Sequence, residues 1–301
     1  MEPFKERVAR GDILISDGAM GTYLQASGLK PGECPEWWCV SHPDVVKGIH
    51  EAYIAAGADV VETNSFGGTR YKLKPYGLEG KVRAVNQAAV ALAKGASAGK
   101  CYVAASVGPT GHIVEDEGGD VTRQDLYEAF KEQVVALAEG GADALCIETM
   151  ASLSEALQAV KAAKENTKLP VMCTFTFEAG PRGFRTMMGV TPERAARETV
   201  AAGADIVGAN CGNGIVNMIE VTRQIRAAQP TTPILIQANA GTPVLEGEKT
   251  VFKETPEFMA SKVPDLIKAG AQIIGGCCGT TPEHIAAMAR AARASGHSVV
   301  T

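Results

Sequence analysis

Apolar residues occur along this chain in short uninterrupted runs and do not alternate with polar residues as they do in half-exposed strands. Four of these runs are 13–16, 101–106, 171–175 and 234–238. A run that is apolar on both faces is typical of a parallel strand buried between two layers. The pattern therefore predicts a buried strand at each of these four places.

A repeated motif predicts four further strands. Gly-Ala-Asp or Gly-Ala-Gln ends a helical pattern and precedes a short apolar run, at 57–59, 141–143, 203–205 and 270–272. A glycine just past the end of a helix typically adopts the left-handed conformation. Polar or sulfur-containing residues stand seven or eight positions after each of these glycines. The repeat thus places reactive residue types at the carboxyl ends of the predicted strands.

Helical stretches separate most of the predicted strands. Three of them begin with Thr-Pro-Glu, at 191–193, 255–257 and 281–283. Threonine is a good N-cap, proline fits the first helical position, and an acidic residue suits the first turn. His42-Pro43 is expected to start a helix that runs to Ala56, and Thr122 one that runs to Glu139.

Eight buried strands that alternate with helices predict an α/β fold, and more specifically a (β/α)₈ TIM barrel formed as a single domain by residues 1–301. An open doubly wound sheet is the alternative. That fold is disfavoured because no Gly-x-Gly-x-x-Gly follows any of the strands. No linker or change of composition divides the chain.

The composition narrows the class of protein. Apolar residues make up 46% and charged residues 21% of the chain, with a net charge of −5 and no basic run. Nucleic acid and anionic membrane surfaces are therefore poor candidates as partners. No signal peptide or membrane-spanning run is evident, so we expect a cytoplasmic protein with reduced thiols. Five cysteines are expected in the core: Cys34, Cys39, Cys101, Cys146 and Cys173.

In a barrel of this kind the functional site lies at the carboxyl ends of the strands. We expect the residues found there to surround one mouth, although they come from distant parts of the chain. They are Asp17-Gly18, Glu62-Thr63-Asn64, Glu148-Thr149, Asn210-Cys211, Asn239 and Cys277-Cys278.

Three of these residues predict a metal site. Cys277 and Cys278 are adjacent, and adjacent cysteines meet the geometric demands of a disulfide poorly. Together with Cys211 they would bind one zinc ion per chain and leave its fourth position open, as in catalytic zinc sites. A thiol that binds at that position loses its proton and becomes a nucleophile. The alternative is that all three are core cysteines that happen to lie at strand ends.

These residues occur in longer motifs that resemble the homocysteine S-methyltransferase family. The motifs are Gly-Gly-Cys-Cys-Gly-Thr-Thr-Pro-Glu-His at 275–284, Asn210-Cys211, Asp-Gly-Ala-Met-Gly-Thr at 17–22 and Glu-Thr-Asn-Ser-Phe at 62–66. The resemblance covers nearly the whole chain. It is strongest to the homocysteine-binding barrel at the N-terminus of cobalamin-dependent methionine synthase, and it includes 108–111 and 238–241.

The resemblance implies a role for each group of residues. Cys211, Cys277 and Cys278 would ligate zinc, homocysteine would supply the fourth ligand, and Asn239 would approach the metal when substrate is absent. Asp17 and Glu148 would lie near the amino group of homocysteine, and Thr281 near its carboxylate. The remaining substrate-binding residues would be Gly18, Glu62, Thr63, Asn64 and Asn210.

The methyl donor is left open by the sequence. The run 62–70 looks most like the cobalamin-dependent branch, but the chain contains no Asp-x-His-x-x-Gly, the cobalamin-ligating pattern. A methyl-corrinoid would therefore come on a separate protein. S-methylmethionine and betaine are the alternative donors. Betaine needs an aromatic enclosure, for which Trp37-Trp38 is the candidate.

Two further functions stay open. One is methyl transfer between a corrinoid protein and a different small thiol or methylated substrate. The other is a non-catalytic role as the docking subunit of a methyltransferase complex, which intact zinc ligands disfavour. His112, in the loop 111–119, is expected to be a solvated residue and not a catalytic one.

Overall fold

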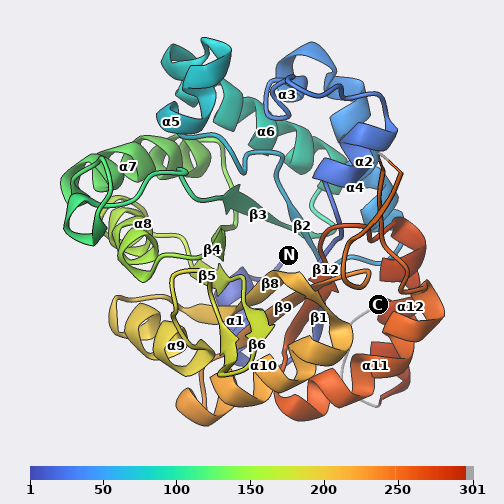
Figure 1. The fold of residues 1–301 in the computed structure, drawn as a ribbon. Coiled ribbons are helices and arrows are strands. Elements are labelled where there is room, and N and C mark those ends of the chain that lie inside the picture. The colour runs from blue at the N-terminus through green and yellow to red at the C-terminus, as the bar shows by residue number, and fades with distance from the viewer. Residues whose placement is uncertain (248, 296–301) are drawn as a thin grey trace.

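The strands form a barrel, as the sequence predicts. A computed structural model describes residues 1–247 and 249–295, and within them eight parallel strands form one sheet in the order β1-β12-β9-β8-β5-β4-β3-β2 (Figure 1). A bridge between Ser16 and Val60 joins β1 to β2, which brings the two edges of the sheet together. The strands are β1 Leu14–Ile15, β2 Val60–Glu62, β3 Tyr102–Val107, β4 Ala144–Met150, β5 Val171–Phe175, β8 Ile206–Gly214, β9 Ile234–Asn239 and β12 Ile273–Gly276. This closure excludes the open doubly wound sheet.

Helices surround the strands (Figure 1). Two hairpins lie in the loops that follow β5 and β9: β6 Glu178–Gly180 with β7 Gly183–Arg185, and β10 Val244–Glu246 with β11 Lys249–Val251. No helix in the described part of the chain combines the length and apolar character needed to cross a membrane. The helices are α1 Phe4–Ala9, α2 Gly21–Ala26, α3 Trp38–Ser41, α4 Pro43–Ala55, α5 Arg70–Leu73, α6 Val82–Ser97, α7 Arg123–Glu139, α8 Leu153–Asn166, α9 Pro192–Ala201, α10 Ile215–Ala228, α11 Pro256–Ala269 and α12 Pro282–Ala294, with 3₁₀ turns η1 Lys74–Tyr76, η2 Glu79–Lys81 and η3 Glu115–Glu117.

The predicted helix starts are confirmed. The side chains of Thr191 and Thr255 accept hydrogen bonds from backbone N–H groups in the first turns of α9 and α11. Thr122 and Asp125 cap α7 reciprocally, each side chain accepting from the backbone of the other. Such caps satisfy amides that the helix itself leaves unpaired, and they fix where each helix begins.

The repeated Gly-Ala-Asp motif has a structural role at the amino ends of the strands. Its glycines have φ values of 99°, 91°, 107° and 114°, the left-handed conformation that the sequence predicts. The three aspartates of the motif each accept a hydrogen bond from a backbone N–H of the preceding strand of the barrel. The pairs are Asp59 with Ile15 (2.9 Å), Asp143 with Val103 (2.8 Å) and Asp205 with Val171 (3.0 Å). The motif therefore fixes the register between neighbouring strands.

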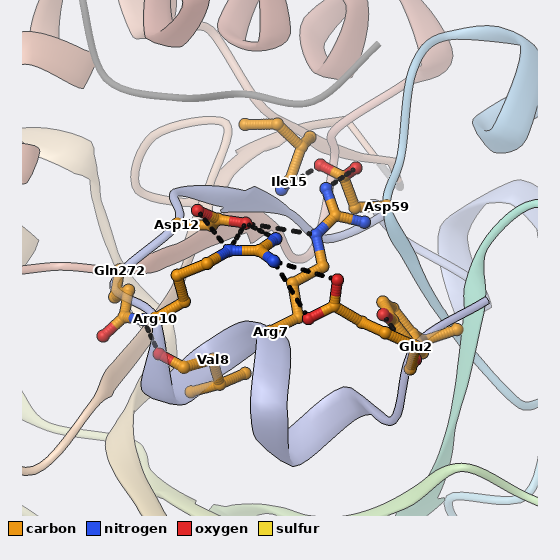
Figure 2. A network of polar contacts seen from close by, with 9 residues as sticks. Glu2, Arg7, Val8, Arg10, Asp12, Ile15, Asp59 and Gln272 are labelled. Atoms are coloured by element: carbon orange, nitrogen blue, oxygen red, sulfur yellow. Dashed lines mark hydrogen bonds and ion pairs between the residues drawn. The ribbon is translucent and has the colours of Figure 1, made fainter.

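The same end of the barrel is closed by α1. Arg7, which is buried, lies 3.0 Å from a carboxylate oxygen of Asp59 and 3.6 Å from one of Asp12 (Figure 2). Arg10 bonds to both Asp12 and Glu2 in the same network. The inward-facing side chains above α1 form a separate apolar cluster, which includes Leu14, Tyr102 and Ile273 from the strands and Phe4 and Val8 from α1. The barrel is thus filled at this end and leaves its opposite end for a site.

The five cysteines that the sequence assigns to the core, at 34, 39, 101, 146 and 173, are all buried. Cys146 points into the apolar cluster inside the barrel, and Cys101 and Cys173 belong to the larger core between the strands and the helices. These thiols contribute to packing.

His50 on α4 makes the stability of the fold sensitive to acid. Its side chain is fully buried, and neither ring nitrogen has a hydrogen-bond partner among the described residues. Burial lowers the pKa of His50 to about 4. Between this value and its usual pKa near ~6.5, the unfolded chain binds a proton that the folded chain does not. Stability is therefore lost as the pH falls through this window.

We expect protonation of His50 to reduce the free energy of unfolding by roughly 2 kcal/mol between about pH 7.5 and about pH 5. Urea unfolding of the wild type and of His50→Leu at the two pH values measures this, because the difference between the two proteins removes the contribution of every other titrating group. Leucine has no titratable group, so the variant should lose less stability in acid. An equal loss in both proteins would contradict the assignment to His50.

Candidate metal and substrate site

The polar residues at the carboxyl ends of the strands surround one cavity of about 290 Å³. They come from the carboxyl ends of five strands, β1, β2, β4, β8 and β12, or from the turns that follow them. The predicted site residues that line the cavity are Asp17, Gly18, Glu62, Thr63, Asn64, Glu148, Thr149, Cys211, Cys277 and Cys278. The barrel thus brings together segments that are up to about 260 residues apart in the chain.

The three cysteines lie together at this cavity. Their sulfur atoms are all within 4.8 Å of one another, and Cys211 Sγ lies 3.9 Å from Cys278 Sγ. Zinc–sulfur bonds of ~2.3 Å in tetrahedral geometry place two sulfur ligands about 3.8 Å apart. The trio therefore fits a zinc ion with one position left for a further ligand. Within the described residues no other group of histidine, cysteine or acidic side chains is arranged to hold a metal.

The backbone is irregular where it presents these residues. Cys211 and Thr149 have φ values of 58° and 59°, which are uncommon for residues with a Cβ. Both lie where the strand pairing shifts, at 147–150 in β4 and at 210–214 in β8. Such irregularities re-aim side chains and are concentrated at functional sites. They turn the tips of β4 and β8 toward the cavity.

The electrostatics of the thiol cluster favour a cation. Hydrogen bonds from Cys277, and then from Cys278, lower the pKa of Cys211, and the side chain of Asn239 contributes in the same direction. The same interactions raise the pKa of Cys277. The three thiols are therefore coupled, so that loss of the proton from Cys211 makes loss of the proton from Cys277 harder. A divalent cation among them would displace the remaining protons and be held by all three sulfurs.

Three buried carboxyl groups form a second part of the site. Burial, with repulsion between the acids as a smaller cause, raises the pKa of Asp17 to about 8, of Glu62 to about 7 and of Glu148 to about 8. Glu62 Oε1 has no hydrogen-bond partner within the described chain. Buried acids that repel one another and lack hydrogen-bond donors are stabilised by a cationic group that brings several N–H donors. This part of the cavity therefore suits an ammonium group.

Asn210 and Asn239 lie behind the cavity and are not among the residues that line it in the described structure. The side chain of Asn210 is fully buried, and its Nδ2 donates to Glu148 Oε2 at 3.1 Å while its Oδ1 accepts from the backbone of Thr149 at 2.8 Å. It positions Glu148. Asn239 is buried beside Cys211, and its Oδ1 lacks a partner within the described residues, which suits an oxygen that turns toward a nearby metal.

Two other predicted residues shape the wall of the cavity. Asn64 Nδ2 donates to the backbone oxygen of Pro35 at 2.7 Å, so the amide holds a neighbouring loop in place. Gly18 packs where a side chain would not fit, because a Cβ would lie 2.6 Å from Thr280 Oγ1 and 2.9 Å from the ring of Tyr53. The close approach of Thr280 and Tyr53 explains why a glycine stands at position 18.

Sequence reasoning missed several residues that line the cavity: Met20, Pro35, Glu36, Phe66, Ser106 and Gln237. Ser106 Oγ donates to Glu148 at 2.5 Å, and Gln237 Oε1 is buried without a partner among the described residues. Gln237 and Ser106 stand within strands that read as wholly buried. Their position before the end of an apolar run is a signal that could have found them.

The remaining candidates lie away from the cavity. Trp38 is buried and stacks on His42, and neither Trp37 nor Trp38 lines the cavity in the described structure. His112 pairs with Asp120 at 2.7 Å and packs against Tyr71 in the loop after β3. Thr281 caps α12, where its hydroxyl donates to Glu283 at 2.6 Å. None of these residues is among those that line the cavity in the described structure.

Fold and site together define an α/β barrel whose mouth carries a cluster of three thiols that could hold a metal ion, beside buried acids. A sequence model of the family described as homocysteine S-methyltransferase matches residues 14–292. The chain belongs to the homocysteine S-methyltransferase family, and this membership places it among the methyltransferases.

Individual relatives agree with the family. The chain is 31% identical over 297 residues to methionine synthase of Mycobacterium tuberculosis, and 30% identical to that of Mycobacterium leprae. In each case the match covers 93% of this chain but only 24% of the relative, so the chain spans about a quarter of those proteins. Among solved structures it is similar to the metallated form of the homocysteine methyltransferase MmuM from Escherichia coli. That match has a TM-score of 0.79 at 25% identity and covers 95% of this chain and 99% of the other.

Proposed function

We propose that this protein is a zinc-dependent methyltransferase that converts homocysteine to methionine, with a methyl-corrinoid on a separate protein as the donor. The observation that carries the proposal is the placement of the three thiols and the three buried acids around one small cavity. Homocysteine has a thiol at one end and an ammonium group at the other. It is a ligand that satisfies both parts of the site at once.

Each part of the site then has a task. Cys211, Cys277 and Cys278 would hold zinc, which supplies a position where a bound thiol loses its proton at neutral pH. Asp17 and Glu148 would bind the ammonium group and so fix the orientation of the substrate. The sulfur of the substrate takes the methyl group, and the electron pair of the broken bond stays with the donor.

Two observations support a corrinoid donor. The run 62–70 resembles the cobalamin-dependent branch of the family, and the relatives at 31% and 30% identity are methionine synthases. Phe66 is the one aromatic side chain that lines the cavity in the described residues, so an aromatic enclosure for betaine is not formed. S-methylmethionine stays the second candidate, because the similar Escherichia coli structure is a homocysteine methyltransferase that this chain matches over 99% of its length.

A panel of donors tests the proposal. Zinc-loaded protein is incubated with homocysteine and, in separate reactions, with methylcobalamin, S-methylmethionine, betaine or S-adenosylmethionine, and methionine is measured. We expect methionine from methylcobalamin. Methionine from S-methylmethionine alone would transfer the assignment to that donor. Methylation of a different thiol, and not of homocysteine, would show that homocysteine is not the methyl acceptor. The absence of product from every donor would favour a role as a docking subunit.

A further inference from the structure

Tyr53 links two turns of the site without lining the cavity. It is fully buried near the end of α4, and its hydroxyl donates to the backbone oxygen of Ala19 at 2.9 Å and lies 3.3 Å from that of Thr280. Side chains on a helix point toward its amino end. Tyr53 therefore reaches from the far end of α4 toward the carboxyl ends of the strands.

Thr280 completes this link. Its hydroxyl donates to the backbone oxygen of Cys277 at 2.8 Å and accepts from the backbone N–H of Ala19 at 3.1 Å. The backbone N–H of Gly276 also donates to the oxygen of Asp17 at 2.9 Å. The turn that carries Asp17 and the turn that carries Cys277 are thus joined by hydrogen bonds to two buried side chains and by one between their backbones.

Both side chains are buried, and a single atom serves both turns in each case. The Tyr53 hydroxyl contacts one acceptor in each turn, and Thr280 Oγ1 bonds to one backbone group in each turn. Gly18 lies between them at a distance that admits no Cβ. The arrangement holds the two turns at one fixed separation.

We infer that Tyr53 and Thr280 are positioning residues that set the distance between the amine-binding acids and the thiol cluster, so that one amino thiol engages both. The inference rests on the proposed function. A ligand bound at two points gains affinity because its second contact is intramolecular, and that gain is lost when the two points move apart. Either point alone binds a single-ended ligand with unchanged strength.

The test uses three ligands on zinc-loaded protein, measured by calorimetric titration. Homocysteine has both ends, ethanethiol has only the thiol, and 2-aminobutyrate has only the amino-acid end. In Tyr53→Phe and in Thr280→Val we expect homocysteine to bind ~10-fold more weakly. Ethanethiol and 2-aminobutyrate should keep their affinities within about twofold, and the zinc content should not change.

Two further variants serve as controls. Thr280→Ser keeps the hydroxyl and should restore the affinity for homocysteine. Tyr102→Phe removes a buried hydroxyl that donates to the backbone oxygen of Glu2 at 2.9 Å, at the opposite end of the barrel, and should bind all three ligands as the wild type does. It matches Tyr53→Phe in chemistry and differs from it in place.

The outcomes are distinguishable. Unchanged homocysteine affinity in both Tyr53→Phe and Thr280→Val would overturn the inference, and so would an equal loss for all three ligands, which indicates general damage. If the wild-type protein binds ethanethiol and 2-aminobutyrate but binds homocysteine no more tightly than either, that result would overturn homocysteine as the substrate and not the role of Tyr53 and Thr280.

Discussion

Replacing Cys211 by alanine is expected to remove zinc from the protein and to lower methyl transfer by on the order of 10³-fold or more. The remaining sulfur atoms of Cys277 and Cys278 are close enough to share one cation, but two ligands bind zinc far more weakly than three. The thiol substrate then keeps its proton at neutral pH, where only a few per cent of a free thiol is ionised.

Metal analysis of the purified variant and of the wild type measures this effect. The wild type should hold one zinc per chain, and homocysteine should replace an oxygen neighbour of the metal by sulfur in its X-ray absorption spectrum. Cys173→Ala is the matched control, because Cys173 is buried in the core and lies outside the thiol cluster. A Cys211→Ala protein with full zinc content and activity would disprove the metal assignment.

Replacing Glu148 by glutamine is expected to lower kcat/KM for homocysteine by roughly 10²-fold, mainly through KM. Glutamine keeps the size of the side chain and can still accept the hydrogen bond from Ser106, but its NH2 group cannot accept the one from Asn210, and it cannot carry the negative charge that a bound ammonium group would stabilise on this buried carboxyl. An ammonium group bound there loses its charged partner where solvent does not compensate. Zinc content should stay unchanged.

Steady-state kinetics with two substrates isolate this effect. The substrate 4-mercaptobutyrate has the thiol of homocysteine but no amino group, so its KM should respond little to Glu148→Gln. Glu155→Gln is the control, since Glu155 is equally buried but accepts hydrogen bonds from Thr110, outside the cavity. Equal losses for both substrates would show that Glu148 supports the site without binding the amine.

The barrel was predictable because its signals are local and repeated. Each buried strand is a continuous apolar run, and glycines and threonine caps mark most of the helix boundaries. The hairpins β6–β7 and β10–β11 were missed for the same reason. In β6 and β10 the side chains are exposed, so neither strand carries the apolar pattern of a buried one.

The candidate site was predictable where residue type and place coincide. Two adjacent cysteines at a strand end have few structural explanations, and Cys211 stands at the same position of the repeat. Asn210 shows where such reasoning ends. Its sequence neighbour Cys211 lines the cavity, but successive side chains of a strand point in different directions, so Asn210 lies behind Glu148. Side-chain direction beside an irregular strand cannot be read from spacing.

The aspartates at the amino ends of β2, β4 and β8 have a consequence for the opposite ends of the same strands. Asp205 ties the base of β8 to the backbone of β5, while the tip of β8 carries the left-handed Cys211. A strand that is anchored at its base can deform at its tip without slipping along its neighbour. Residues at the carboxyl ends of the strands can therefore be exchanged, a cysteine included, without loss of the hydrogen bonds at the amino ends that hold the strands in register.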